Sequence, residues 1–270
     1  MIETSTLPRR IRVPQLTVVS AYLAAIAGAE LLTAFVNAEA GMAVHAVLLL
    51  VLLNHAMALG PAAVPPTGRM SAEPGRVLVA VLALLPLLRL FSLTMPTRGL
   101  SPLFWYLLIG APLLTAVVLI VRYVHYSPVD ARIWGWSLQQ GLIGATGIPL
   151  GIIAYVTFFR VPVVESHDIP YLIIGAGILV VFLGLLEELI FRALLQPYLC
   201  SLYGATRGVL ITAAMSAVFS SGSRSPVTML FTFVVALCYG WLVHTNRSIM
   251  GVAISHGLIG IMTILVLPNL

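Results

Sequence analysis

The chain has 270 residues, of which 60% are hydrophobic and only 9% are charged, and its mean hydropathy is +1.06. Soluble domains carry about 25% charged residues, so the composition excludes a soluble fold and indicates an integral membrane protein. The net charge of +5 comes from arginines, because the sequence contains no lysine. We expect this charge to contact membrane lipids. The sequence contains no basic run with interleaved aromatic residues, so we expect no nucleic-acid partner.

In chain order, the sequence shows nine apolar segments that are long enough, or nearly so, to cross a bilayer as helices. They cover residues 16–35, 42–59, 77–93, 104–121, 142–159, 172–195, 209–219, 227–243 and 249–267. The seventh is short, and we expect it to extend back through Thr206 and Arg207. The sequence therefore predicts an all-α fold, a polytopic membrane helix bundle of about 8–9 transmembrane helices.

The chain divides into two predicted parts. Residues 1–124 form a four-span N-terminal membrane extension that carries no recognisable motif, and residues 125–270 form the core that carries the chemistry. The distribution of arginine predicts a cytoplasmic N-terminus, since positive residues favour cytoplasmic loops. With that orientation, only three loop arginines lie on the opposite side: Arg98, Arg160 and Arg224.

Three charged residues stand close together inside the sixth apolar segment: Glu187, Glu188 and Arg192. An ionised side chain at mid-membrane costs about 2.5–3.5 kcal/mol on insertion scales, so such residues are kept for a reason. Glu188 and Arg192 are four residues apart and share a helix face, so we expect them to pair. Glu187 points roughly 100° away, toward a neighbouring helix. One glutamate is therefore predicted to be structural and the other available.

The EExxxR pattern of Glu187, Glu188 and Arg192, with Phe219 on the next helix and a closing segment from Gly240 to His256, has a known counterpart. From about residue 133 to the C-terminus the chain resembles the CPBP family (CAAX protease and bacteriocin-processing, also called Abi) of intramembrane glutamate proteases. The resemblance implies a membrane endopeptidase in a bacterial plasma membrane. Its substrate would be a membrane-associated peptide or a prenylated C-terminal tail.

The resemblance also implies roles for individual residues. Glu187 would activate a water, supported by Glu188 and Arg192, together with a histidine that ends an FxxxH motif. His256 would stabilise the oxyanion with the asparagine of an HxxxN motif. In this chain Ser223 stands where the first motif has histidine, and Gly260 stands where the second has asparagine. The chain is therefore a divergent member in which each pair has lost one residue.

These two departures predict weakened or lost catalysis. A positioned general base contributes roughly 10²–10⁴-fold, and one oxyanion donor roughly 10²–10³-fold. His256 could act as a general base oriented by Glu187, and Ser223 or His244 could reach the water, so a compensated reaction stays open. We predict no cofactor and no metal site, because Glu187, Glu188 and His256 lack the HExxH spacing and an evident third ligand.

The polar residues of the extension have simpler interpretations. Glu30 lies in the first span, and Arg89 at the end of the third is its expected partner. His45 and His55 flank the second span; membrane histidines can ligate a pigment or haem, but single histidines without a partner pattern usually do not.

Three functions remain open at this level. The first is a working intramembrane endopeptidase. The second is a catalytically inactive scaffold or accessory subunit, which keeps the cluster at Glu187 and His256 as structure and binds partner membrane proteins. The third, a transporter or channel, is disfavoured because the sequence shows no inverted repeat and no pair of broken helices.

Overall fold

The computed structural model describes residues 13–59, 74–95, 101–123, 134–158 and 168–269. Throughout these ranges the chain forms helices joined by short turns, and no strand occurs in them. Each of the nine predicted apolar segments corresponds to one helical segment. The prediction of an all-α membrane bundle is therefore confirmed.

Several of the helical segments are made of consecutive helices. In chain order they are α1 (Val13–Phe35), α2 (Ala38–Ala58), α3 (Pro74–Leu82) with α4 (Leu84–Thr94), α5 (Pro102–Tyr123), α6 (Leu138–Ala145) with α7 (Gly147–Thr157), α8 (Ile169–Ile178) continuing through η2 (Leu179–Leu185), α9 (Leu186–Glu188), η3 (Leu189–Leu195) and α10 (Gln196–Tyr203), α11 (Ala205–Phe219) with the turn η4 (Ser220–Ser223), α12 (Pro226–Asn246), and α13 (Met250–Gly260) with η5 (Ile261–Val266) and η6 (Leu267–Asn269).

Length and apolarity decide which of these helices can cross a membrane alone. In the described part of the chain, 7 helical segments meet both conditions. The two shorter ones are α11, with 15 residues, and the apolar helix Met250–Val266. α11 begins at Ala205, so the seventh segment extends back as predicted.

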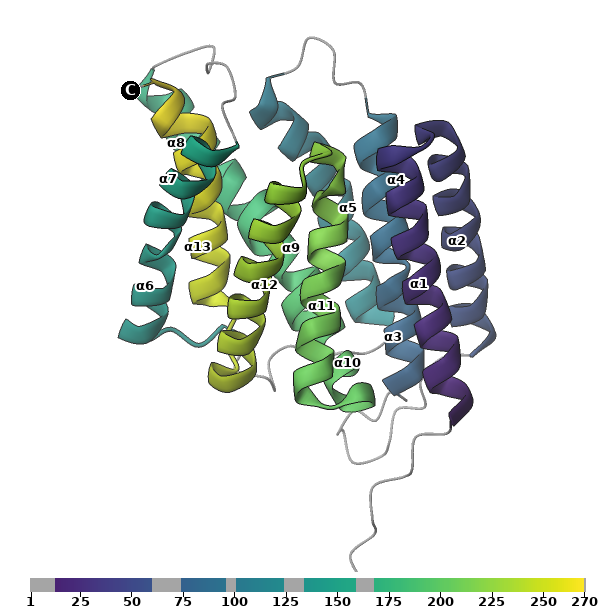
Figure 1. Ribbon diagram of the computed structural model, residues 1–270. Helices are drawn as coiled ribbons and strands as arrows, with labels where there is room; N and C mark the ends of the chain where they lie inside the picture. The colour runs from purple at the N-terminus through teal and green to yellow at the C-terminus, as the bar shows by residue number, and fades with distance from the viewer. Residues whose placement is uncertain (1–12, 60–73, 96–100, 124–133, 159–167, 270) are drawn as a thin grey trace, which may run out of the picture.

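Successive helical segments run in alternating directions across the bundle. As Figure 1 shows, α1 starts at the lower end and the last helix finishes at the upper end. The ends of α5 and α12 and the start of α11 share the lower end with the start of α1, whereas η4 lies at the upper end. The arrangement is that of a bundle whose two described termini face opposite sides of a membrane.

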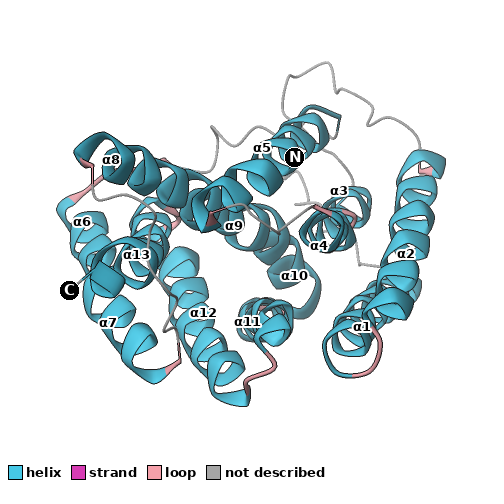
Figure 2. Ribbon diagram, turned by 90° about the horizontal axis from the view of Figure 1, so that it is seen from above, coloured by secondary structure: helices cyan, strands magenta, loops and turns pink. Residues whose placement is uncertain are grey.

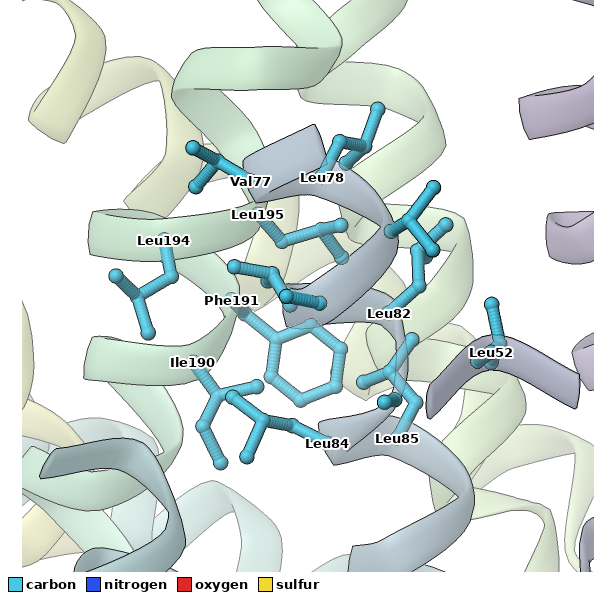
Figure 3. Packing of buried hydrophobic residues seen from close by; sticks show 14 of the residues in the cluster. Leu52, Val77, Leu78, Leu82, Leu84, Leu85, Ile190, Phe191, Leu194 and Leu195 are labelled. Carbon is cyan, nitrogen blue, oxygen red and sulfur yellow. The ribbon is translucent and has the colours of Figure 1, made fainter. Parts of the chain in front are cut away.

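The most deeply buried span is formed by α3 and α4, with 56% of its residues enclosed. Seen from above in Figure 2, it lies inside the bundle among α1, α2, α5 and α10. The largest hydrophobic cluster joins its Leu78, Leu82 and Leu85 to Ile190 and Phe191 of η3 (Figure 3). The core thus draws on residues from both sides of position 124. The boundary itself lies outside the described residues, and the two-part division stays a prediction.

Glycines set the closest approaches between helices of the core. A Cβ added at Gly147 would collide with backbone atoms of Ser255 on α13, and one at Gly151 with Met262. Gly147 and Gly151 form a small-xxx-small pair, which lets this helix pack closely against its neighbour. A Cβ at Gly184 of η2 would collide with the carbonyl oxygen of Ala253, and one at Gly257 would lie 2.9 Å from Cα of Val180. The helices that carry the glutamates and the histidine are therefore in backbone contact.

Candidate active site

The glutamate pair sits near the middle of a continuous helix of 35 residues, Ile169–Tyr203. The short α-helical piece α9 holds both glutamates and is flanked by the π-helical stretches η2 and η3. At their ends the N–H of Leu186 donates to the carbonyl of Val181, and that of Gln196 donates to Phe191. Such wide turns within α-helices are frequent at functional sites; here they flank the two glutamates, and Arg192 lies in the second of them.

The ion pair expected from the i, i+4 spacing is present. The Nε of Arg192 lies 3.1 Å from Oε2 of Glu188, and both side chains are buried. Nη2 of Arg192 also donates to the carbonyl oxygen of Ala236 on α12, at 3.5 Å. Because a lone buried charge is costly, each of the two residues makes burial of the other tolerable.

His256 of α13 lies between the two glutamates. Its Nδ1 is 2.9 Å from Oε1 of Glu188, and its Nε2 is 3.9 Å from Oε2 of Glu187. Burial differs sharply within the cluster, since Glu188 is 0% exposed whereas Glu187 is 37% and His256 is 23% exposed. The structure thus gives one sealed carboxylate that orients the imidazole and one accessible carboxylate beside its other nitrogen.

Ser223 lies outside this cluster. It is exposed in the turn η4, where its Oγ donates to the carbonyl oxygen of Ser220 and accepts from the N–H of Ser225. His244 is exposed near the end of α12, with its ring 6.0 Å from that of Trp241. None of the hydrogen bonds recorded for the described residues brings Ser223 or His244 to Glu187. The catalytic role of Ser223 stays a prediction.

The position of the missing asparagine is closed by packing. A Cβ built on Gly260 would come within 2.5 Å of Cδ2 of Leu183 on η2. A larger residue at Gly260 therefore requires Leu183 to move.

A buried hydroxyl network beside His256 was not anticipated from the sequence. The hydroxyl of Tyr239 on α12 donates to Oγ of Ser255 at 2.6 Å, and Ser255 Oγ lies 2.9 Å from Oγ1 of Thr146. Two glutamines also brace the same helices. Gln196 donates to the carbonyl of Gly240, and the Gln140 side chain accepts from an N–H of α13. The sequence offers one signal for this hydroxyl network and for the two glutamines: amide and hydroxyl groups inside apolar spans need hydrogen-bond partners within the protein.

The extension holds a second buried charge cluster. Nε of Arg89 on α4 donates to Oε1 of Glu30 on α1 at 2.9 Å, and Nη2 of Arg89 contacts the other carboxylate oxygen. The expected Glu30–Arg89 pair is therefore present. Nε2 of His45 lies 3.4 Å from Oε1 of Glu30, and Nδ1 of His55 hydrogen-bonds the hydroxyl of Tyr22 at 2.8 Å. Both histidines thus have local partners.

Metal ligation has no support from the side-chain arrangement. Within the described ranges, no group of three or more His, Cys, Asp or Glu residues is placed so that it could hold a metal ion. The absence of cofactors stays a prediction.

Part of the chain is similar to a known protein family. Residues 169–262 match the profile of the family described as Rce1-like, type II CAAX prenyl endopeptidase. The matched segment covers about a third of the chain, starting later than the resemblance seen in the sequence, and includes Glu187, Glu188, Arg192 and His256. The chain is thus an integral membrane protein whose residues 169–262 are similar to the Rce1-like family, and the predicted resemblance to CAAX proteases is confirmed over this segment. No curated protein and no solved structure matches it significantly.

Proposed function

We propose that the protein is an intramembrane endopeptidase of reduced power, in which Glu187 and His256 activate a water. The observation that carries this proposal is the position of His256, with Nδ1 on Glu188 and Nε2 facing Glu187. A carboxylate that holds one imidazole nitrogen fixes the orientation of the ring and leaves the other nitrogen for proton transfer. Glu188 supplies that orientation here.

The distance between the two remaining groups suits a shared water. With 3.9 Å between Nε2 of His256 and Oε2 of Glu187, a water beside them can hydrogen-bond both at ordinary lengths. One group removes a proton as the water attacks a peptide carbonyl, and the other delivers a proton to the leaving amine. Both groups lie on the accessible edge of the cluster. The Glu188–Arg192 pair forms the buried part of the cluster.

The substrate class follows from the family and the surroundings. We infer a membrane-associated peptide, such as a prenylated C-terminal tail, because the matched family is described as prenyl endopeptidases. Exposed apolar side chains on many of the helices provide the lipid contact that brings such a substrate to the protein. We further propose a bacterial plasma membrane as the location. There Arg122, Arg207 and Arg247, which share the end of the bundle where α1 starts, would face the cytoplasm.

The proposed rate is low because two groups are missing. Ser223 bonds within its own turn, and Leu183 fills the space next to Gly260. The same two observations favour a second candidate function. In that case the cluster at His256 is a structural remnant, and the protein is an inactive scaffold that binds a partner membrane protein.

One experiment separates the two functions. The full chain and Glu187→Gln are reconstituted in lipid vesicles with a farnesylated peptide, and new peptide N-termini are counted by mass spectrometry. Glu39→Gln is the matched control, since Glu39 is exposed at the start of α2. Cleavage by the wild type and the control but not by Glu187→Gln supports the endopeptidase. If none of the three proteins cleaves the peptide, and the protein purified from native membranes retains a stoichiometric partner protein, the scaffold function is supported.

A further inference from the structure

The two buried charge clusters are joined by a continuous chain of contacts through two phenylalanines. The Cζ of Arg89 lies 5.5 Å from the centroid of the Phe219 ring. The Phe219 and Phe191 rings meet edge to face, with centroids 5.9 Å apart and planes at 72°. Cζ of Arg192, the next residue along the chain, lies 5.8 Å from the centroid of the Phe191 ring. An arginine of the extension thus touches the pair of rings that supports the arginine of the site.

We propose that Arg89 is a positioning residue for the candidate active site. Through Phe219 and Phe191 it holds Arg192, which fixes Glu188 and thereby the orientation of the His256 ring. The four-span extension is then a working part of the site. The kinetic part of this inference rests on the proposed endopeptidase function, whereas its effect on the His256 imidazole does not.

Arg89 itself is held firmly enough for this role. Its Nε donates to Glu30, which is 0% exposed, and its Nη2 donates to the carbonyl oxygen of Phe219 at 2.9 Å. That carbonyl belongs to the last residue of α11, where a cation also complements the helix dipole. A planar guanidinium makes these contacts and stacks on the ring together, which a lysine ammonium cannot do. Arg89 therefore contacts both the backbone carbonyl and the ring of Phe219, the first residue of the altered FxxxH sequence.

The extension fixes Phe191 from a second direction. Phe191 is 2% exposed and lies in the cluster with Leu78, Leu82, Leu84 and Leu85, as Figure 3 shows. A ring packed at such density cannot shift without moving its neighbours. Movement of Phe219 is thus transmitted to Phe191 and its contacts, rather than absorbed by empty space.

The site end of the chain is equally constrained. Arg192 lies 3.1 Å from Oε2 of Glu188, and the other oxygen of that carboxylate lies 2.9 Å from Nδ1 of His256. Both Arg192 and Glu188 are sealed from solvent, so water cannot replace a contact that is lost. A tilt of the Arg192 guanidinium therefore moves the carboxylate that sets the imidazole.

The test uses the full chain in lipid nanodiscs with ¹⁵N-labelled histidine, and His256→Gln assigns the His256 signal. The variants are Arg89→Met, Arg89→Lys and the conservative Phe219→Leu. Arg207→Met is the matched control for loss of an exposed arginine. Phe158→Leu is the control for the ring pair Phe158–Phe231, whose centroids are 5.1 Å apart outside this chain of contacts.

We expect Arg89→Met and Phe219→Leu to shift the His256 imidazole signals and to lower kcat by about 2- to 30-fold with little change in KM. Arg89→Lys should give a smaller change of the same kind. Both controls should leave the His256 signals in place. In a double-mutant cycle, Arg89→Met and Phe219→Leu should be non-additive, because they interrupt the same contacts.

Other results would overturn the inference. If Arg89→Met and Phe219→Leu lower the thermal midpoint but leave the His256 signals unchanged, Arg89 only stabilises the fold. If Arg89→Met does not fold, the same conclusion follows from unchanged signals in Phe219→Leu alone. An absence of proteolysis in the wild type would contradict the proposed function, and the shift of the His256 signals would still decide the role of Arg89.

Discussion

The two charge clusters are built from the same side-chain types and differ mainly in exposure. In the extension, Glu30 and His45 are both 0% exposed, and Arg89 is 12% exposed. In the core, Glu188 and Arg192 are equally sealed, but Glu187 and His256 retain an accessible edge. Each cluster sets a carboxylate against an arginine and a histidine, and only the core cluster adds a second carboxylate.

Under the proposed function, the enclosed cluster of the extension is structural and the accessible cluster of the core is reactive. A fully enclosed ion pair is an expensive structural device, whose value lies in fixing neighbours rather than in adding stability. A reactive pair must reach both water and substrate, which the sealed cluster cannot do. Charged residues in a span therefore do not by themselves define a site, and the proposed site rests on the exposure of Glu187 beside an oriented imidazole.

The largest expected effect separates the clusters by chemistry. Glu187→Gln and His256→Gln each remove a proton-transfer group, so peptide cleavage should fall by about 10²–10⁴-fold. Thermal stability should change little for Glu187→Gln, because that side chain is partly exposed. Cleavage of a farnesylated peptide in vesicles provides the measurement. Unchanged cleavage in Glu187→Gln would remove Glu187 from the reaction.

The next largest effect separates them by stability. Glu30→Ala leaves the largely enclosed Arg89 without its counter-charge, which should cost about 3–5 kcal/mol of unfolding free energy. Glu187→Ala should cost about 1 kcal/mol or less, as for exposed ion pairs. Equilibrium unfolding in mixed detergent micelles compares the two. Equal losses would mean that exposure does not distinguish the clusters.

A smaller effect tests whether the sealed pair is needed for stability at all. The double variant Glu30→Leu, Arg89→Met replaces both charges by apolar groups of similar length. It should be at least about 2 kcal/mol more stable than Glu30→Leu alone, because no unpaired charge remains. If Arg89 positions the site, kcat should stay low in this double variant even though stability returns. Recovery of both would contradict the positioning role.

The smallest effect concerns the lost asparagine. Gly260→Asn overfills the space beside Leu183 and should cost about 1–3 kcal/mol of stability. Adding Leu183→Ala should restore part of this loss by making room for the new side chain. Thermal unfolding of both variants checks the expectation. A fully stable Gly260→Asn would show that the space is not closed.

Much of the fold was predictable because the bilayer restricts the chain to helices. Apolar segments located every helical segment, and the i, i+4 spacing predicted the Glu188–Arg192 pair. The breaks at Ala83 and Thr146 and the π-helical stretches were not predicted. Most of their residues are of the same apolar types as in the neighbouring helices, and tertiary packing decides where they occur.

The site was predictable in its residues but not in its connections. Charge in an apolar span singled out Glu187 and Glu30, because it is costly. No spacing rule could show that His256 would lie between two glutamates, since that depends on how α13 crosses α9. Nor could the sequence reveal the contact of Phe219 with Phe191, because phenylalanine is an ordinary residue of membrane helices.

The glycine contacts between η2 and α13 carry one mechanical consequence. A Cβ added at Gly184 would collide with the carbonyl oxygen of Ala253, and one added at Gly257 would lie 2.9 Å from Cα of Val180, so the two helices approach backbone to backbone. Sliding one helix past the other would force backbone atoms into collision, so the axial position of η2 relative to α13 is fixed. The main chain thereby sets the spacing of the backbones that carry Glu188 and His256, whereas the orientation of the two side chains depends on contacts such as that of Arg192 with Glu188.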